Sequence, residues 1–436
     1  MSTKVSHVRY LILLLLFAIT TINYADRAIL SIVGATMQDE LGITSVQMGL
    51  LFSAFAWAYV IGQIPGGWLL DRFGTKNVYA WSIFLWSIFT LLQATVGWYS
   101  LTISVIALFF FRFFVGLAES PAFPGNSRIT AAWFPAAERG TAAGIFTSAQ
   151  YFATVMFAPL MGWVTFHYGW RAVYISMSLL GVIMTIVWIK VIRAPDQHKS
   201  VTKAELEYIR SGGGLIELDT PKTDKLSSGP TWADFKILIT NRMTIGIFIG
   251  QYCINVLSYF FLTWFPIYLV KARGMSILQA GMIASIPAIC GFFGGVLGGF
   301  LSDLMIKRGY SLTIARKTPL VLGMIMSMTM IICNYTQNST LIIMIMAMAY
   351  FGKGFGAIGW AVISDIAPQK IAGLCGGVFN ACGNTAGITT PIVIGFILST
   401  TGSFSSALAF VAAHAALAVF CYLVIVGKIE RMSTNK

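Results

Sequence analysis

The sequence has little charge. Only 10% of its 436 residues are Asp, Glu, Lys or Arg, whereas a soluble globular domain has about 25%. Hydrophobic residues make up 57% of the chain. The remaining polar side chains are too few to cover the surface of a soluble fold, which would expose large apolar patches. The shortage of charge therefore excludes an ordinary soluble domain and predicts that lipid covers much of the surface.

Enzyme motifs are also missing. The four histidines are scattered along the chain without the spacing of metal ligands: His7, His167, His198 and His414. The sequence contains no GxSxG elbow, HExxH zinc motif or phosphate-binding P-loop, and no segment resembles a channel filter. We therefore expect neither an enzyme nor a channel, and we expect no cofactor and no metal. A membrane-embedded enzyme remains a remote alternative.

What the sequence does contain is a series of long apolar runs. Many approach the ~20 residues that an α-helix needs to cross a bilayer. Twelve spans are predicted, at residues 10–35, 47–70, 77–97, 101–125, 141–165, 171–192, 243–270, 277–302, 316–336, 340–365, 373–399 and 405–427. Unbroken runs of this length favour helices over barrel strands. The predicted fold class is an all-α membrane protein with twelve transmembrane helices.

The distribution of basic residues predicts the orientation of the chain. The 29 Lys and Arg residues outnumber 16 acids, yet only Arg171, Lys271 and Arg273 fall in loops that follow an odd-numbered span. Most others lie in the tails and the remaining loops. This is the positive-inside pattern, which places both termini in the cytoplasm. The excess of positive charge therefore indicates topology, and we expect no nucleic-acid partner.

One long polar segment, residues 193–242, divides six spans from six. We expect residues 1–192 and 243–436 to form two six-helix bundles, joined by this segment as a cytoplasmic linker. Within it, Thr202-Lys-Ala-Glu205 matches a capping box, which predicts a short surface helix that ends near Gly212.

The two halves repeat a pattern at a nearly fixed offset. Gly67-x-x-x-Asp71 recurs as Gly299-x-x-x-Asp303, and WFPAAERGTAAGIF (133–146) aligns with IAPQKIAGLCGGVF (366–379). Two parallel six-helix halves, with a site between them at mid-membrane, are typical of secondary transporters. Alternating access by rocking of one half against the other would follow.

Five charged residues lie inside the predicted spans: Asp26, Arg27, Arg112, Glu119 and Lys353. A charge in hydrocarbon costs roughly 2.5–3.5 kcal/mol on insertion scales. This cost is tolerated when the charges pair, face water or handle a charged cargo. Three cations and two acids therefore predict a proton-coupled site for an anion.

The depth of each charge follows from a rise of about 1.5 Å per helical residue. Asp26 and Arg112 are predicted at one level, with Glu119 closer to the cytoplasm. We expect protonation of Asp26 to release an Asp26–Arg112 pair and to couple to transport; a purely structural pair is the alternative. Glu119 is expected to be a second proton site, or else the ionised partner of an unidentified donor.

Several motifs carry a family resemblance. GWLLDRFGTK (67–76) resembles the signature loop of the major facilitator superfamily. NYADRA (23–28), RFFVGLAESPAFPGN (112–126) and GQYCINVLSYFFLTWFP (250–266) resemble its anion:cation symporter family, in particular bacterial glucarate/galactarate proton symporters. The resemblance implies two pseudo-symmetric halves and proton-coupled uptake of a sugar diacid across the bacterial inner membrane. We expect a monomer whose partners are the lipid bilayer, protons and a sugar-acid anion.

The resemblance also implies roles for individual residues. It assigns proton handling to Asp26 and Glu119, and binding of a substrate carboxylate to Arg27. By position in matching motifs, it adds substrate-binding residues on several helices: Tyr24, Tyr59, Gln150, Trp360 and Asn380. The signature-loop positions assign gating to Asp71, Arg72 and Asp303.

Side-chain chemistry supports two carboxylate-binding cations. The Arg27 guanidinium can grip a carboxylate through two parallel hydrogen bonds, and Asn23 and Tyr24 share its side of the helix. Its alternative role is to pair only with another helix. Lys353, in FGKGFGAIGW (351–360), is expected to meet the second carboxylate of a diacid; otherwise it pairs with Glu119 or a backbone carbonyl. Intramembrane polarity adds three weaker candidates: Gln251, Asn255 and Asn384.

Charge balance predicts the coupling. Three cations minus two ionised acids leave a charge of +1, and protonation of both acids raises it to +3. A divalent substrate is therefore expected to bind best to the protonated form, with at least two protons per cycle. Symport of a related aldonate or hexuronate is the alternative, and drug efflux is a remote one.

Overall fold

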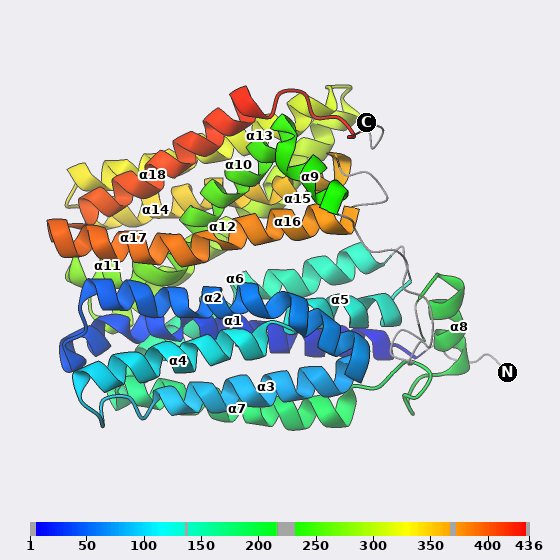
Figure 1. Cartoon of the computed structure of the whole chain (residues 1–436), viewed down its shortest axis with the longest axis horizontal. Coiled ribbons are helices and arrows are strands. Elements are labelled where there is room, and N and C mark those ends of the chain that lie inside the picture. Colours follow the sequence, from blue (N-terminus) through cyan, green and yellow to red (C-terminus); the bar gives the residue numbers. More distant parts are fainter. Residues whose placement is uncertain (1–5, 136–137, 215, 217–231, 367–371, 433–436) are drawn as a thin grey trace. The chain divides into compact units, whose positions relative to one another are not determined.

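The computed structural model describes residues 6–135, 138–214, 216, 232–366 and 372–432, and its regular elements are helices (Figure 1). The chain divides into two compact units. Unit 1 comprises Met1–Ile29 and Ala54–Lys225, and unit 2 comprises Leu30–Ser53 and Leu226–Lys436. Each unit has its own buried apolar core. The predicted domain limits, 1–192, 193–242 and 243–436, remain a prediction.

Most helices of the first half are long. They are α1 (Val8–Leu41), α2 (Ser45–Phe73), α3 (Thr75–Gln93), α4 (Leu101–Glu119), α5 (Ala122–Trp133), α6 (Arg139–Tyr168), α7 (Trp170–Val191) and α8 (Lys203–Ser211). Helix α3 packs against α4 and α7 (Figure 1). Helix α8 confirms the predicted surface helix, because Thr202 caps its start and Gly212 its end.

The helices of the second half are more often interrupted. They are α9 (Trp232–Thr240), α10 (Arg242–Tyr259), η1 (Phe260–Trp264), α11 (Phe265–Lys271), α12 (Ile277–Lys307), α13 (Leu312–Met328), η2 (Thr329–Tyr335), α14 (Ser339–Gly354), η3 (Phe355–Ala357), α15 (Ile358–Ile366), α16 (Ala372–Asn384), α17 (Ala386–Thr401), α18 (Phe404–Phe420) and η5 (Cys421–Ile425). Helix α12 packs on α14, and α10 on α16 and α18.

Among the described residues, ten helical segments are long and apolar enough to cross a membrane. They coincide with ten of the predicted spans. The other two predicted spans, 77–97 and 141–165, overlap α3 and α6, which are helical but are not among those ten segments. The helical membrane fold is therefore confirmed, whereas the count of twelve spans remains a prediction.

Two interruptions place charged residues at helix ends. Helix α4 stops at Glu119 because Pro121 has no N–H to continue the helical hydrogen bonds. Helix α14 stops at Gly354, directly after Lys353, and continues as a tighter turn. A Cβ on Gly352 or Gly354 would collide with the backbone of α13 or α12. This glycine-rich segment therefore contains both a close approach between helices and a break in the α-helix.

Candidate functional site

Arg27 and Glu119 form an ion pair inside unit 1. The Nε of Arg27, on α1, donates a 2.8 Å hydrogen bond to Oε2 of Glu119, the last residue of α4. The side chain of Glu119 is 0% exposed and that of Arg27 is 10% exposed. The unidentified donor that the sequence allowed for Glu119 is therefore Arg27. The proton role of Glu119 remains a prediction.

Aromatic rings surround the Arg27 guanidinium. Its Cζ lies 4.6 Å from the ring centroid of Tyr24, and 4.7 Å from those of Phe55 and Tyr59 on α2. Such distances favour cation–π attraction, which strengthens as the group is desolvated. The predicted proximity of Tyr24 and Arg27 is confirmed. Phe55 was not singled out, because an aromatic residue in an apolar span gives no sign of its partner.

Four polar atoms around this ion pair are buried and form no hydrogen bond. They are Nη2 of Arg27, Oε1 of Glu119, and both amide atoms of Asn23. Asn23 lies near Glu119, but neither of its amide atoms completes a hydrogen bond. Buried polar atoms are nearly always paired, and leaving them unpaired is costly. The cluster therefore offers donors and acceptors to a polar ligand.

Asp26 lies in a different buried environment, although it adjoins Arg27 in sequence. Its Oδ2 accepts a 2.6 Å hydrogen bond from Thr90 on α3. Arg112, on α4, is near enough to interact electrostatically with Asp26. Both residues are buried. The sequence analysis missed Thr90. The signal that could have found it was a hydroxyl group inside the third apolar span, which needs a hydrogen-bond partner.

A second polar group lies in unit 2, between α10 and α16. Gln251 donates to Asn255 at 3.3 Å. The Tyr259 hydroxyl donates to Asn384 at 3.0 Å, and Asn384 donates to Oδ1 of Asn380 at 3.1 Å. The structure thus shows hydrogen bonds among four residues that the sequence analysis named, and it adds Tyr259. Hydroxyl and amide groups of this kind suit the hydroxyls of a sugar.

Within the described residues of unit 2, Lys353 forms no ion pair with a carboxylate. Its Nζ is 5.2 Å from the ring centroid of Tyr350, and the side chain is half-buried. Glu119 is held by Arg27 within unit 1, and the alternative of a Lys353–Glu119 pair remains a prediction. Trp360 is 49% exposed and packs edge-on against Phe379. On α6, Gln150 is half-buried.

The predicted gating residues have different surroundings. On α13, Arg316 contacts Asp303 at 3.2 Å and Asp365 at 2.8 Å. Asp303 is therefore part of a three-residue charge cluster, two members of which the sequence analysis missed. Arg72 is exposed and lies over Trp68 and Phe73. The side chain of Asp71 lies outside the described residues.

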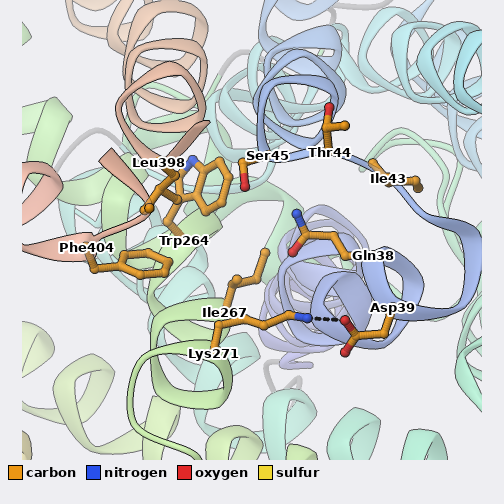
Figure 2. Close-up of a pocket in the computed structure, with 11 residues that line it drawn as sticks. Gln38, Asp39, Ile43, Thr44, Ser45, Trp264, Ile267, Lys271, Leu398 and Phe404 are labelled. Carbon is orange, nitrogen blue, oxygen red and sulfur yellow. Dashed lines mark hydrogen bonds and ion pairs between the residues drawn. The ribbon is translucent and has the colours of Figure 1, made fainter. Parts of the chain in front are cut away.

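A polar cavity of about 370 Å³ opens elsewhere in unit 2 (Figure 2). Lys271 points toward Asp39 across it and forms an ion pair (Figure 2). Trp264 also lines the cavity and donates to the carbonyl of Pro391 at 3.2 Å. A Cβ on Gly49 would lie 2.5 Å from that same carbonyl, so α2 and α17 touch through their backbones here.

No predicted substrate or proton residue lines this cavity. Within the described ranges, no group of three or more His, Cys, Asp or Glu side chains is placed to hold a metal ion. The unpaired polar atoms around Arg27 are therefore the stronger candidate for a binding site.

Comparison with known sequences identifies relatives of the whole chain. Residues 16–316 match the family described as Major Facilitator Superfamily. The probable galactarate/D-glucarate transporter GudP of Escherichia coli (strain K12) is 59% identical, over 98% of this chain and 96% of that protein. GudP of Bacillus subtilis (strain 168) is 56% identical over 99% and 95%. The D-galactonate transporter of Escherichia coli O6:H1 is 41% identical over 97% of both.

Solved structures share the fold at low sequence identity. A bacterial homologue of the human lysosomal transporter Spinster, in an inward-facing and unoccupied conformation, has a TM-score of 0.72 at 18% identity, with 98% of this chain and 96% of that chain covered. The xylose transporter XylE from E. coli, in an inward open conformation, has a TM-score of 0.71 at 14% identity, with 98% of both chains covered.

Proposed function

Because the chain belongs to the Major Facilitator Superfamily, it is a membrane transporter and not an enzyme, and we propose that it takes up galactarate or D-glucarate together with protons by alternating access. The relatives named as probable galactarate/D-glucarate transporters match it over nearly their full length. Their names support a six-carbon sugar diacid as the substrate.

The observation that carries this proposal is the unused hydrogen-bonding capacity beside Arg27. Its Nε is occupied by Glu119, whereas Nη2 has no acceptor. A substrate carboxylate at Nη2 would satisfy that donor. The neighbouring hydroxyl of a sugar acid would meet the free oxygen of Glu119 and the free amide of Asn23. A ligand with a carboxylate beside hydroxyls therefore matches the set of unpaired atoms.

The same ion pair gives proton coupling a physical basis. Loss of the negative charge on Glu119 by protonation weakens its hold on Arg27 and frees the guanidinium for the substrate anion. Asp26, held by Thr90 and close to Arg112, is the second proposed proton site. At least two protons would accompany each dianion, as the charge balance requires.

The second half of the chain supplies the remaining proposed contacts. Lys353 is proposed to bind the far carboxylate, since its ammonium has no acid partner among the described residues of unit 2. The two hydrogen-bonded pairs, Gln251 with Asn255 and Tyr259 with Asn384, are proposed to bind hydroxyls. Tyr59, Gln150, Trp360 and Asn380 complete the proposed set, with Asp71, Arg72 and Asp303 as gating residues.

The finer description of the protein is also proposed. It has twelve spans in two six-helix halves, with both termini in the cytoplasm, and it acts as a monomer in the bacterial inner membrane. The distribution of Lys and Arg supports this orientation.

Uptake into proteoliposomes tests the proposed function. Purified protein is reconstituted, and an inward proton gradient is imposed with galactarate, D-glucarate, D-galactonate and a hexuronate as separate substrates. Gradient-dependent accumulation of the diacids is expected, and a protonophore should abolish it. Preferential transport of D-galactonate would instead favour the aldonate alternative, which the 41% identical relative supports. No uptake of any sugar acid would contradict the proposal.

A further inference from the structure

A buried acid on the linker helix α8 holds the start of α1. The side chain of Glu205 is 0% exposed. Its Oε2 accepts hydrogen bonds from Ser6 Oγ at 2.6 Å and from the Val8 amide at 3.1 Å. Its Oε1 accepts from the amide and from Nη1 of Arg9, each at 3.2 Å. The first N–H groups of a helix have no partner within it, and Glu205 supplies one from another helix.

The predicted capping box is formed only in part for this reason. Thr202 Oγ1 accepts from the amide of Glu205 at 3.3 Å, as the motif requires. The Glu205 carboxylate does not return the bond, because the amide of Thr202 donates to Ser6 Oγ at 2.9 Å instead. The amide of Ser6 donates to Thr202 Oγ1 at 3.1 Å. The two helix starts therefore cap each other.

Arg9 extends this contact to the segment before α6. Its side chain is 7% exposed, and Nε contacts Glu138 at 3.2 Å. Its Cζ lies 4.5 Å from the ring centroid of Tyr10 and 4.9 Å from that of Tyr208, and the Tyr208 hydroxyl donates to Glu138 at 2.5 Å. We define the clasp as this connected set: Ser6, Arg9, Glu138, Thr202 and Glu205.

The clasp sits at the base of the helix that carries the proposed site. Helix α1 runs from Val8 to Leu41 without a proline, so it lacks the usual cause of a sharp kink. Arg27 lies 18 residues beyond Arg9, about 27 Å along the axis. A displacement at the start of such a helix is carried to Arg27. The 2.8 Å bond from Arg27 to Glu119 tolerates only a small displacement.

We propose that Glu205 is a positioning residue for transport: by capping α1 and neutralising Arg9, it sets the depth at which α1 presents Arg27 and Asn23. Glu205 touches no substrate, and it acts through α1 alone. This role rests on the proposed function of Arg27 in binding a carboxylate. It also assigns to the linker a task beyond that of joining the two halves.

The first test compares Glu205→Gln with Glu207→Gln in proteoliposomes. Both changes remove one acid from α8, but Glu207 is exposed and lies outside the clasp. Glu205→Gln is expected to raise the KM for galactarate about tenfold, because a 1 Å misplacement can cost up to about 100-fold, whereas Glu207→Gln should keep the wild-type KM. Arg9→Gln should raise KM similarly, and the double variant should add little. A lower melting temperature with unchanged KM and kcat would overturn the positioning role.

A disulfide provides a second, independent test. Ser6 Oγ and Thr202 Oγ1 lie 3.1 Å apart, so Ser6→Cys with Thr202→Cys should form a cross-link on oxidation. A fixed clasp predicts that the oxidised protein retains the KM and turnover of the reduced one. Arrest of transport by oxidation, reversed by a reductant, would show that the clasp must open in each cycle and would overturn a fixed positioning role. The variants Ser6→Cys alone and Thr202→Cys alone are the controls.

Failure of the proposed function and failure of the positioning role of Glu205 give different results. If wild-type protein takes up no diacid, the proposed function fails before any variant is compared. If the wild type transports and Glu205→Gln matches it in KM and turnover, only the positioning role fails.

Discussion

Arg27 donates a hydrogen bond to Glu119 through Nε alone and leaves Nη2 without an acceptor. A guanidinium that only joined two helices would be expected to use both faces of its fork. One nitrogen of the Arg27 guanidinium, Nε, is therefore occupied by Glu119, whereas Nη2 is open to a ligand. The first two predictions below depend on this arrangement.

Arg27→Lys should weaken substrate binding. A lysine ammonium lacks the planar fork and cannot hold Glu119 and a substrate carboxylate in the same geometry. The KM for galactarate is expected to rise at least tenfold in gradient-driven uptake. Arg210→Lys, on the exposed surface of α8, is the control. An unchanged KM for Arg27→Lys would rule out binding of the substrate carboxylate by the Arg27 guanidinium.

Glu119→Gln should separate substrate binding from proton coupling. The amide keeps the shape of the side chain but never carries a negative charge, so Arg27 stays available to the substrate at every pH. Gradient-driven accumulation is expected to be lost, whereas exchange of labelled for unlabelled galactarate continues. Wild-type accumulation by this variant would exclude Glu119 as a proton site.

Asp26→Asn should also abolish accumulation while exchange persists, because the variant cannot bind and release a proton. Thr90→Val is the companion variant: it removes the 2.6 Å hydrogen bond to Asp26 but leaves the carboxylate. It is expected to shift the external pH at which uptake is half-maximal while accumulation is retained. Full accumulation by Asp26→Asn would contradict the assignment.

Lys353→Gln should discriminate between diacids and monoacids. If Lys353 binds the second carboxylate, its loss raises the KM for galactarate at least tenfold more than the KM for D-galactonate. Competition between the two substrates in one preparation measures this ratio directly. An equal loss for both would mean that Lys353 has no contact specific to the far carboxylate.

Gly49→Ala should destabilise unit 2. The added methyl group would lie 2.5 Å from the carbonyl of Pro391, and overpacking of this kind costs about 1–3 kcal/mol. A lower melting temperature of the purified protein is expected. Gly377→Ala is the matched control, since no atom lies within 4 Å of its added Cβ. Equal melting temperatures for the two variants would refute the close contact between α2 and α17.

The sequence predicted much of the fold because hydrophobic run length reports membrane spans directly. It also pointed to five charged residues inside apolar runs, and the structure buries three of them, Asp26, Arg112 and Glu119. The expected nearness of Asp26 and Arg112 agrees with the structure, in which both are buried and interact electrostatically. These properties depend on one helix at a time.

The sequence left open the contacts that depend on how neighbouring helices pack against each other. The pairing of Arg27 with Glu119 requires the rotation of α1 against α4, which residue spacing within either helix does not contain. Likewise, Thr202 and Glu205 matched a capping box, but the carboxylate caps α1 because Ser6 lies beside it. The contacts of Lys271 with Asp39 and of Arg316 with Asp365 were missed for the same reason.

Gly116 has a consequence for how the site can move. A side chain there would strike the carbonyl of Phe55, so α4 and α2 meet backbone to backbone, and Ser120 ties them again through the carbonyl of Gly62 at 3.0 Å. Glu119 on α4 and Tyr59 on α2 are therefore held by two helices that are packed rigidly against each other. With α2 and α4 tied to each other and the start of α1 held by the clasp, release of the Arg27 guanidinium is left to rotation of its own side chain.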